Sequence, residues 1–134
     1  MARFCMRKEA EEWFRIAKEE LQSAEYLFEK QLYRMVCYHS QQAVEKALKS
    51  LLVEKDVDVP RTHNILDLRN AVKRIGFNIS LSDEDAIFLN AIYRVRYPSD
   101  LGLLPTGAPT HDDAKKALDS ATEIIGKLQD LNNQ

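Results

Sequence analysis

Apolar residues recur every three or four positions along most of the chain, which is the spacing of one face of an α-helix. Residues 8–30 show this stripe first, and residues 32–54 repeat it after a short join near Gln31. Glutamate and lysine fill the opposite face of the first segment. Because the join is short, we expect the two segments to pack as an antiparallel helical hairpin.

A third, shorter helix is predicted over roughly residues 63–75. The loop "DVDVPRTHN" precedes it and supplies two capping candidates, Thr62 and Asn64. Gly76 stands just past its end, where glycine commonly terminates a helix.

Two more helices complete the pattern. The segment "SLSDEDAIFLNAIYRVRY" starts with the capping residue Ser82 and is then apolar at nearly every position, which predicts a central, buried helix. A loop rich in proline and glycine follows it. Thr110 then caps a fifth helix over about residues 111–131.

The fold class that follows is all-α. We expect an antiparallel up-and-down bundle of four main helices plus a short helix, since no alternating strand pattern and no repeat interrupts the helical periodicity. With 134 residues, the chain is expected to form a single domain over residues 1–134. The formal net charge of -2 provides no general basic field for nucleic acids.

Cysteine use and hydropathy point to a reduced, cytoplasmic protein. The two cysteines, Cys5 and Cys37, have no metal-ligand spacing and make no disulfide framework. We see neither a signal peptide nor a membrane span, and we expect no metal and no cofactor.

The stretch "YRVRYPSD" combines positive charge with aromatic rings. On a helix, Arg94 and Arg96 point about 160° apart. Arg94 continues a narrow polar line with Asp83 and Asn90. Arg96 instead falls among apolar neighbours, namely Phe88, Leu89 and Ile92.

Two interpretations of these arginines remain open. Both cations can interact favourably with the negative, C-terminal end of the helix dipole. Alternatively, a guanidinium group binds phosphate or carboxylate while Tyr97 or Tyr93 stacks on a base.

The three histidines differ in their surroundings. His63 lies in the first turn of the third helix, where its imidazole could touch an anion. His39 lies near an apolar stripe beside a polar ridge of the second helix, and we expect a satisfied structural residue. His111 opens the fifth helix and is expected to be exposed. The chain contains no Walker motif, no metal-spaced histidine pair and no nucleophile elbow.

Three segments together resemble the HEPN (higher eukaryotes and prokaryotes nucleotide-binding) domain family. They are "AEEWFRIAKEELQSAEYLFEKQLYRMVCYHSQQAVEKALKSLL", "THNILDL" and "YRVRYPSD". The resemblance covers about residues 10–128, and "SQQAVEKALK" is its most specific part. It implies a helical bundle that forms a homodimer or a higher homo-oligomer. It also implies a small nucleotidyltransferase as partner, commonly as a toxin–antitoxin pair.

Some members of this family resemble RNA-cutting toxins, which use an arginine followed after four to six residues by a histidine. Arg96 matches the arginine, but the next histidine is His111, across the proline- and glycine-rich loop. Arg34 and His39 have the spacing in the second helix, where the family does not keep its motif, so we treat that match as coincidental.

Three functional hypotheses follow. The first is a module that binds a nucleotide or RNA, or pairs with a small nucleotidyltransferase, or does both. Its expected contacts are Arg96, Tyr97, Arg94, Asn90, Tyr93 and His63. The alternative is a metal-independent ribonuclease toxin, in which Arg96 stabilises the phosphate and His111 or His63 moves protons. The third is a structural bundle that only oligomerises and uses the arginines as caps, with Asp85 or Asp100 as carboxylate partners.

Overall fold

The computed structural model describes residues 6–93 and 107–133, and within them it contains five α-helices and no strand. The helices are α1 (Lys8–Glu29), α2 (Tyr33–Glu54), α3 (Ile65–Arg74), α4 (Asp83–Tyr93) and α5 (His111–Asn132). The all-α class is confirmed. The helices begin and end within two residues of the predicted positions, apart from the end of α4, whose predicted continuation past Tyr93 lies outside the described residues.

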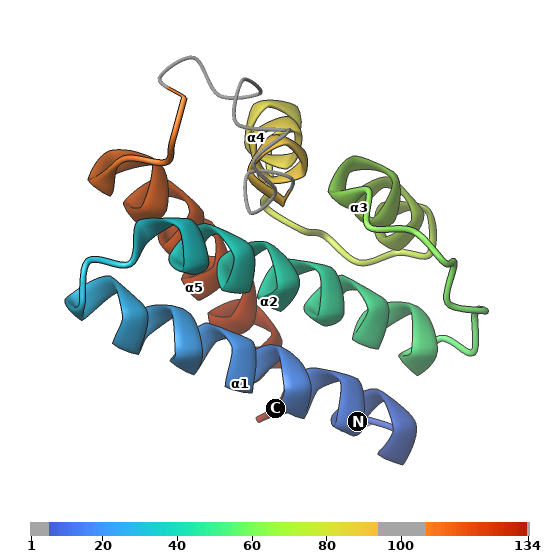
Figure 1. Cartoon of the computed structure of the whole chain (residues 1–134). Helices are drawn as coiled ribbons and strands as arrows, with labels where there is room; N and C mark the ends of the chain where they lie inside the picture. Colours follow the sequence, from blue (N-terminus) through green and yellow to red (C-terminus); the bar gives the residue numbers. More distant parts are fainter. Residues whose placement is uncertain (1–5, 94–106, 134) are drawn as a thin grey trace.

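The five helices form a bundle around α2 (Figure 1). The short turn at Gln31 reverses the chain, so that α1 and α2 run side by side in opposite directions, as predicted. α2 packs against each of the other four helices. α5 lies behind the α1–α2 hairpin, and α3 and α4 lie together against a further side of α2.

The prediction that the fourth helix is the central one is wrong. α4 buries one narrow face, made by Ala86, Leu89 and Ile92, while Ile87 is 56% exposed. α2 buries 15 of its 22 residues, although many of them are polar. The central position is therefore held by the helix that has neighbours on most sides, and not by the most apolar helix.

Side chains cap the starts of α3, α4 and α5, as the sequence predicts. Of the two candidates for α3, Asn64 is the cap, and its carboxamide oxygen accepts a hydrogen bond from the Asp67 amide at 3.2 Å. Ser82 Oγ accepts from the Asp85 amide at 3.0 Å. At α5 the cap is reciprocal: Thr110 Oγ1 accepts from the Asp113 amide at 3.2 Å, and the Asp113 carboxylate accepts from the Thr110 amide at 2.9 Å.

The α3–α4 pair is joined by a buried guanidinium group. Arg69 of α3 donates to the carbonyl of Leu81 at 2.9 Å and forms an ion pair with Asp83, the first residue of α4. Gly76 turns the chain out of α3 with φ +101°, a conformation that disfavours side-chain-bearing residues. None of the described helices is both long and apolar enough to cross a lipid bilayer.

The reciprocal cap of α5 gives a direct stability test. Thr110→Ala should lower the free energy of unfolding by about 1 kcal/mol, because the Asp113 amide at the helix start loses its side-chain acceptor. Urea unfolding followed by circular dichroism measures the change. Thr122→Ala is the matched control in the same helix, since its exposed hydroxyl bonds only to the Leu118 carbonyl. Equal losses in the two variants would contradict the capping role.

Cys37 lies in the core on α2. Burial raises the pKa of its thiol to about 12, and the negative charge of Asp113 adds to the rise. In the unfolded chain the thiol has its ordinary pKa, near 8.5. The folded protein therefore keeps a proton that the unfolded chain releases above about pH 9.

This difference predicts a pH-dependent loss of stability. Between about pH 9 and pH 10.5, the contribution of Cys37 to the free energy of unfolding should fall by about 1.4 kcal/mol per pH unit. Urea titrations of the native protein and of Cys37→Ala across this range isolate the effect, because all other titrating groups are common to both. The stability gap between them should change with that slope, and a constant gap would disprove the assignment.

Candidate functional site

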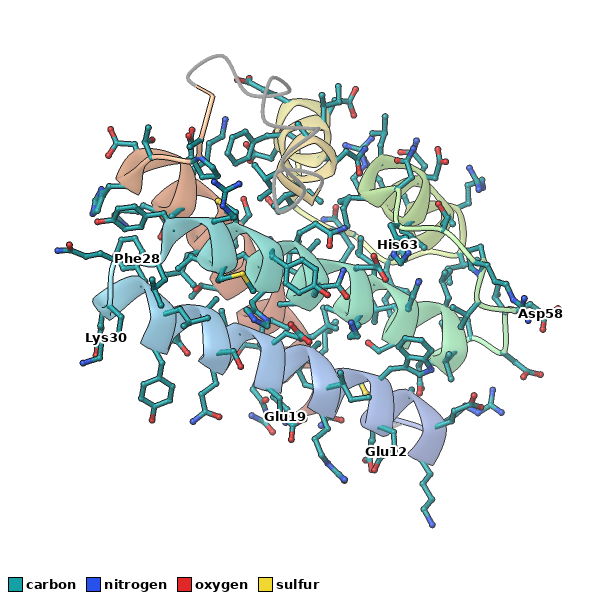
Figure 2. The ribbon with its side chains drawn as sticks, in the orientation of Figure 1. Glu12, Glu19, Phe28, Lys30, Asp58 and His63 are labelled. Carbon is teal, nitrogen blue, oxygen red and sulfur yellow. The ribbon has the colours of Figure 1, made fainter. Side chains whose placement is uncertain are left out.

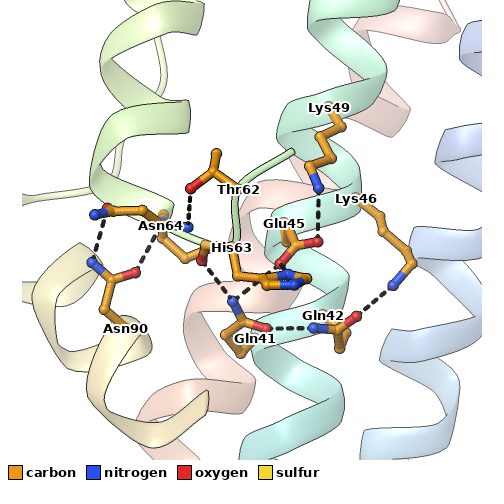
Figure 3. A network of polar contacts seen from close by, with 10 residues as sticks. Gln41, Gln42, Glu45, Lys46, Lys49, Thr62, His63, Asn64 and Asn90 are labelled. Atoms are coloured by element: carbon orange, nitrogen blue, oxygen red, sulfur yellow. Dashed lines mark hydrogen bonds and ion pairs between the residues drawn. The ribbon is translucent and has the colours of Figure 1, made fainter. Parts of the chain in front are cut away.

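The polar ridge of α2 consists of Arg34, Tyr38, Gln41, Gln42, Glu45 and Lys49, and its last four residues are buried. Gln41, Gln42, Glu45 and Lys49 are each less than a tenth exposed, although they belong to residue types that usually face water. Figure 3 shows how they pair. Gln42 Nε2 donates to Gln41 Oε1 at 2.8 Å, and Lys46 Nζ donates to Gln42 Oε1 at 2.6 Å.

The carboxylate of Glu45 is the centre of this network. Its Oε2 accepts from Lys49 Nζ at 3.0 Å, one helical turn further along α2. Its Oε1 lies 2.8 Å from His63 Nδ1 and 3.4 Å from Gln41 Nε2. A buried charge is tolerated only when it is paired and hydrogen-bonded, and these three groups meet that condition.

His63 reaches this network from the loop between α2 and α3. Gln41 Nε2 donates to its backbone carbonyl at 3.2 Å, which ties the loop to α2 independently of the ring. The His63 side chain is 57% exposed, whereas that of Glu45 is only 4% exposed. The imidazole is therefore the outer end of a buried polar chain (Figure 3).

The prediction that His63 lies in the first turn of a helix is wrong by two residues. α3 begins at Ile65, with Asn64 as its cap, so that His63 stands just before the cap. The Asn64 amide donates to Thr62 Oγ1 at 3.0 Å, which holds this residue in the extended conformation of a cap. The helix starts at Ile65 because Asn64, and not Thr62, is its cap. The Ile65 amide, which a Thr62 cap could bind, donates to Asn90 Oδ1 instead.

Asn90 brings α4 to the same place. Its Oδ1 accepts from the Ile65 amide at 2.7 Å, and its Nδ2 donates to Asn64 Oδ1 at 3.1 Å. The carboxamide thus satisfies the first amide of α3 and steadies the cap. Two of the predicted contact residues, His63 and Asn90, are consequently gathered at the start of α3.

The other predicted contacts follow Asn90 in the chain. Tyr93 is the last described residue of α4, and Arg94, Arg96 and Tyr97 lie outside the described residues. Asp85, a predicted carboxylate partner for the arginines, has Lys116 Nζ at 4.0 Å.

His111 lies elsewhere. It is exposed, as predicted, and its ring stands 5.1 Å from Phe28 and 5.5 Å from Tyr33 between centroids, while Nδ1 lies 3.1 Å from Asp112. Tyr33 begins α2, and Glu45 lies twelve residues further on, which is about 18 Å along the helix axis. His111 and His63 therefore belong to different regions of the surface.

His39 is the satisfied structural residue that was predicted. Its Nδ1 lies 2.7 Å from Glu20 Oε2, which links α2 to α1. His63, by contrast, lies in the loop between α2 and α3 (Figure 2). The His39–Glu20 pair lies in the α1–α2 interface. His39, the histidine of the Arg34–His39 spacing, therefore has a structural role. Among the described residues, no group of three or more His, Cys, Asp and Glu side chains is arranged to hold a metal ion.

Sequence reasoning missed Glu45 and Gln41 as members of the site. The available signal was the spacing of four that separates Gln41, Glu45 and Lys49, which places them on one line of α2. That line lies within "SQQAVEKALK", the most specific part of the resemblance.

The buried carboxylate can be tested through Lys49. Lys49→Met should lower the free energy of unfolding by about 3 kcal/mol or more, because it removes the cation from a buried anion. Lys46→Met is the matched control. It removes a half-buried lysine whose acceptor, the Gln42 amide, is uncharged, so its cost should be about 1 kcal/mol. Guanidinium or urea unfolding gives both values, and equal costs would show that Glu45 does not depend on Lys49.

Comparison with known proteins agrees with this fold. Residues 10–131 match the HEPN domain family. Among curated proteins, none matches the chain. The crystal structure of TT1696 from Thermus thermophilus is similar at 27% identity and a TM-score of 0.74, over 93% of this chain and 99% of that one.

Two further crystal structures are similar in fold. The archaeal HEPN homologue ST0689 is 24% identical, with a TM-score of 0.64 over 96% of this chain and 97% of its own. The HEPN domain protein tm0613 from Thermotoga maritima is 22% identical, with a TM-score of 0.67 over 92% and 98%. Because the family match spans nearly the whole helical bundle, the chain belongs to the HEPN domain family.

Proposed function

We propose that this chain is a cytoplasmic binding module for a nucleotide or RNA, with its site at the start of α3 and in the segment that follows α4. One observation carries the proposal: a half-exposed imidazole, His63, is held by a buried carboxylate directly before a helix N-terminus. Asn90 joins α4 to that same helix start.

The chemistry of this region suits phosphate. A helix N-terminus carries a partial positive charge, which stabilises anions. Arg94, Arg96 and Tyr97 follow the described end of α4 by one, three and four residues. Guanidinium groups bind phosphate through paired hydrogen bonds, and a tyrosine ring can stack on a base.

Within this proposal, each predicted contact has a role. Arg96 supplies the charge, Tyr97 the stacking face, and Arg94 a polar flank. Since the formal net charge of the chain is -2, binding depends on these local groups and not on a general basic field.

Association with other chains belongs to the same proposal. The HEPN resemblance implies a homodimer or a higher homo-oligomer and a nucleotidyltransferase partner, as in a toxin–antitoxin pair. Leu32 and Met35, next to the α1–α2 turn, are 51% and 37% exposed, and such apolar surface favours association. Both the oligomer and the partner stay predictions.

Arg96 provides the test. Binding of a fluorescein-labelled single-stranded RNA, followed by anisotropy, should weaken about tenfold in Arg96→Ala, because a charge-assisted contact to phosphate is worth roughly 1.5 kcal/mol. The slope of log affinity against log salt should also fall by about 1. Arg15→Ala, an exposed arginine of α1 that pairs with Glu12, is the matched control and should bind as the native protein does.

The same samples separate binding from cleavage. Unchanged affinity in Arg96→Ala would remove Arg96 from the site, and absence of RNA and nucleotide binding by the native protein would end the proposal. Gel analysis of the RNA after incubation in EDTA completes the experiment. If the native protein cleaves the RNA and neither Arg96→Ala nor His111→Ala does, the ribonuclease alternative replaces the binding module as the proposed function.

A further inference from the structure

α4 has two apolar faces, and the bundle buries one of them. The buried face consists of three apolar residues, Ala86, Leu89 and Ile92. Ile87, Phe88 and Ala91 lie on the other side of the helix, since residues three and four positions apart share a face. Ile87 is 56% exposed, and α4 lies at the edge of the bundle (Figure 1). An apolar helix face that stays at the surface is typical of an interaction site.

The surroundings of this outer face are acidic. Glu84, one turn before Phe88, lies on the face itself. A groove of about 410 Å³ adjoins the face, between the start of α4 and the outer side of α5. Lys116 connects the groove and the face, because its Nζ lies 4.5 Å from the centre of the Phe88 ring and 4.0 Å from the Asp85 carboxylate.

Carboxylates outnumber ammonium groups on this surface. The groove and the face together present five carboxylates, those of Glu84, Asp85, Asp112, Asp119 and Glu123. They present two ammonium groups, those of Lys115 and Lys116, and Lys115 Nζ lies 3.2 Å from both carboxylate oxygens of Asp119. The outer face of α4 is therefore an apolar strip beside a negatively charged groove.

We propose that this surface docks a basic amphipathic helix of a partner protein. Apolar side chains of the partner helix cover Ile87 and Phe88, and its lysine and arginine side chains pair with carboxylates of the groove. Ile87 and Ala91 are one helical turn apart, which suits the packing of a second helix along α4. Docking at this surface needs neither the start of α3 nor the residues beyond Tyr93.

The negative charge distinguishes this occupant from others. Nucleic acids and anionic membranes carry negative charge themselves, so the carboxylates repel them. A second copy of this chain brings the same carboxylates to the contact, whereas a basic partner neutralises them. An uncharged apolar partner gains only the contact with the apolar strip. A helix that is apolar on one side and basic on the other complements both parts of the surface.

Three synthetic peptides of about 15 residues test the chemistry of the partner. The first places leucines on one helical face and lysines on the other, the second replaces the lysines with glutamates, and the third scrambles the first. Each peptide carries fluorescein, and its binding to the native protein is followed by anisotropy. The first peptide should bind about tenfold more tightly than the other two, because it alone combines an apolar stripe with positive charge.

Four variants assign the binding to the outer face of α4. Ile87→Gln should weaken binding of the first peptide about tenfold, because a polar side chain replaces the most exposed part of the apolar strip. Leu32→Gln is its matched control, since Leu32 is 51% exposed at the α1–α2 turn, and it should leave the affinity unchanged. Glu84→Gln should weaken binding about threefold, whereas Glu25→Gln, which removes an exposed charge from α1, should not. Circular dichroism checks that all four fold, as expected for changes at exposed positions.

Equal affinities for the three peptides, or no binding of the first, would overturn the proposal. So would equal losses in Ile87→Gln and Leu32→Gln. Two further outcomes would assign the face to another occupant and overturn the proposal as well. One is a native dimer, seen by analytical ultracentrifugation, that Ile87→Gln separates into monomers. The other is binding of labelled RNA that Ile87→Gln weakens.

Discussion

A negative charge in the middle of a helical bundle must be neutralised where it lies, and Glu45 imposes this requirement on the structure around it. Lys49 and Gln41 meet part of it from the same helix, and His63 meets the rest from the following loop. The loop is thereby held against α2 just before α3 begins. The start of α3 then determines where Asn90, and with it α4, can bind. One buried carboxylate thus connects the central helix to the region that we propose as the binding site.

Helix positions could be predicted because the information is local: apolar spacing, capping side chains and turn residues lie within a few positions of one another. Which helix lies at the centre of the bundle could not be predicted from such local information. Residues 86–95 are almost entirely apolar, yet Ile87 is exposed, because hydrophobicity indicates what a segment can bury and not what surrounds it. The polar ridge of α2 illustrates the converse. Its pattern predicts polarity along one line, but its burial depends on neighbouring segments that cover it.

Part of the candidate site could be predicted because its signals are also local in the sequence. His63 and Asn90 were singled out because each stands near a helix feature that the sequence displays. Glu45 and Gln41 were missed because their partner, His63, is 18 and 22 residues away, and only the folded chain brings them together. The roles of Arg94, Arg96 and Tyr97 stay predictions, since these residues lie outside the described part of the chain.

The Asn90 carboxamide has a consequence for motion. Pulling α4 away would break the hydrogen bond from the Ile65 amide to Asn90, at a cost of about 0.5–1.5 kcal/mol. The shared guanidinium of Arg69 adds to that cost. α3 and α4 should therefore detach from the bundle together, as one cooperative unit, and not one after the other. A ligand that holds the chain beyond Tyr93 would then also stabilise the loop that carries His63, which is thermodynamic coupling between the two halves of the site.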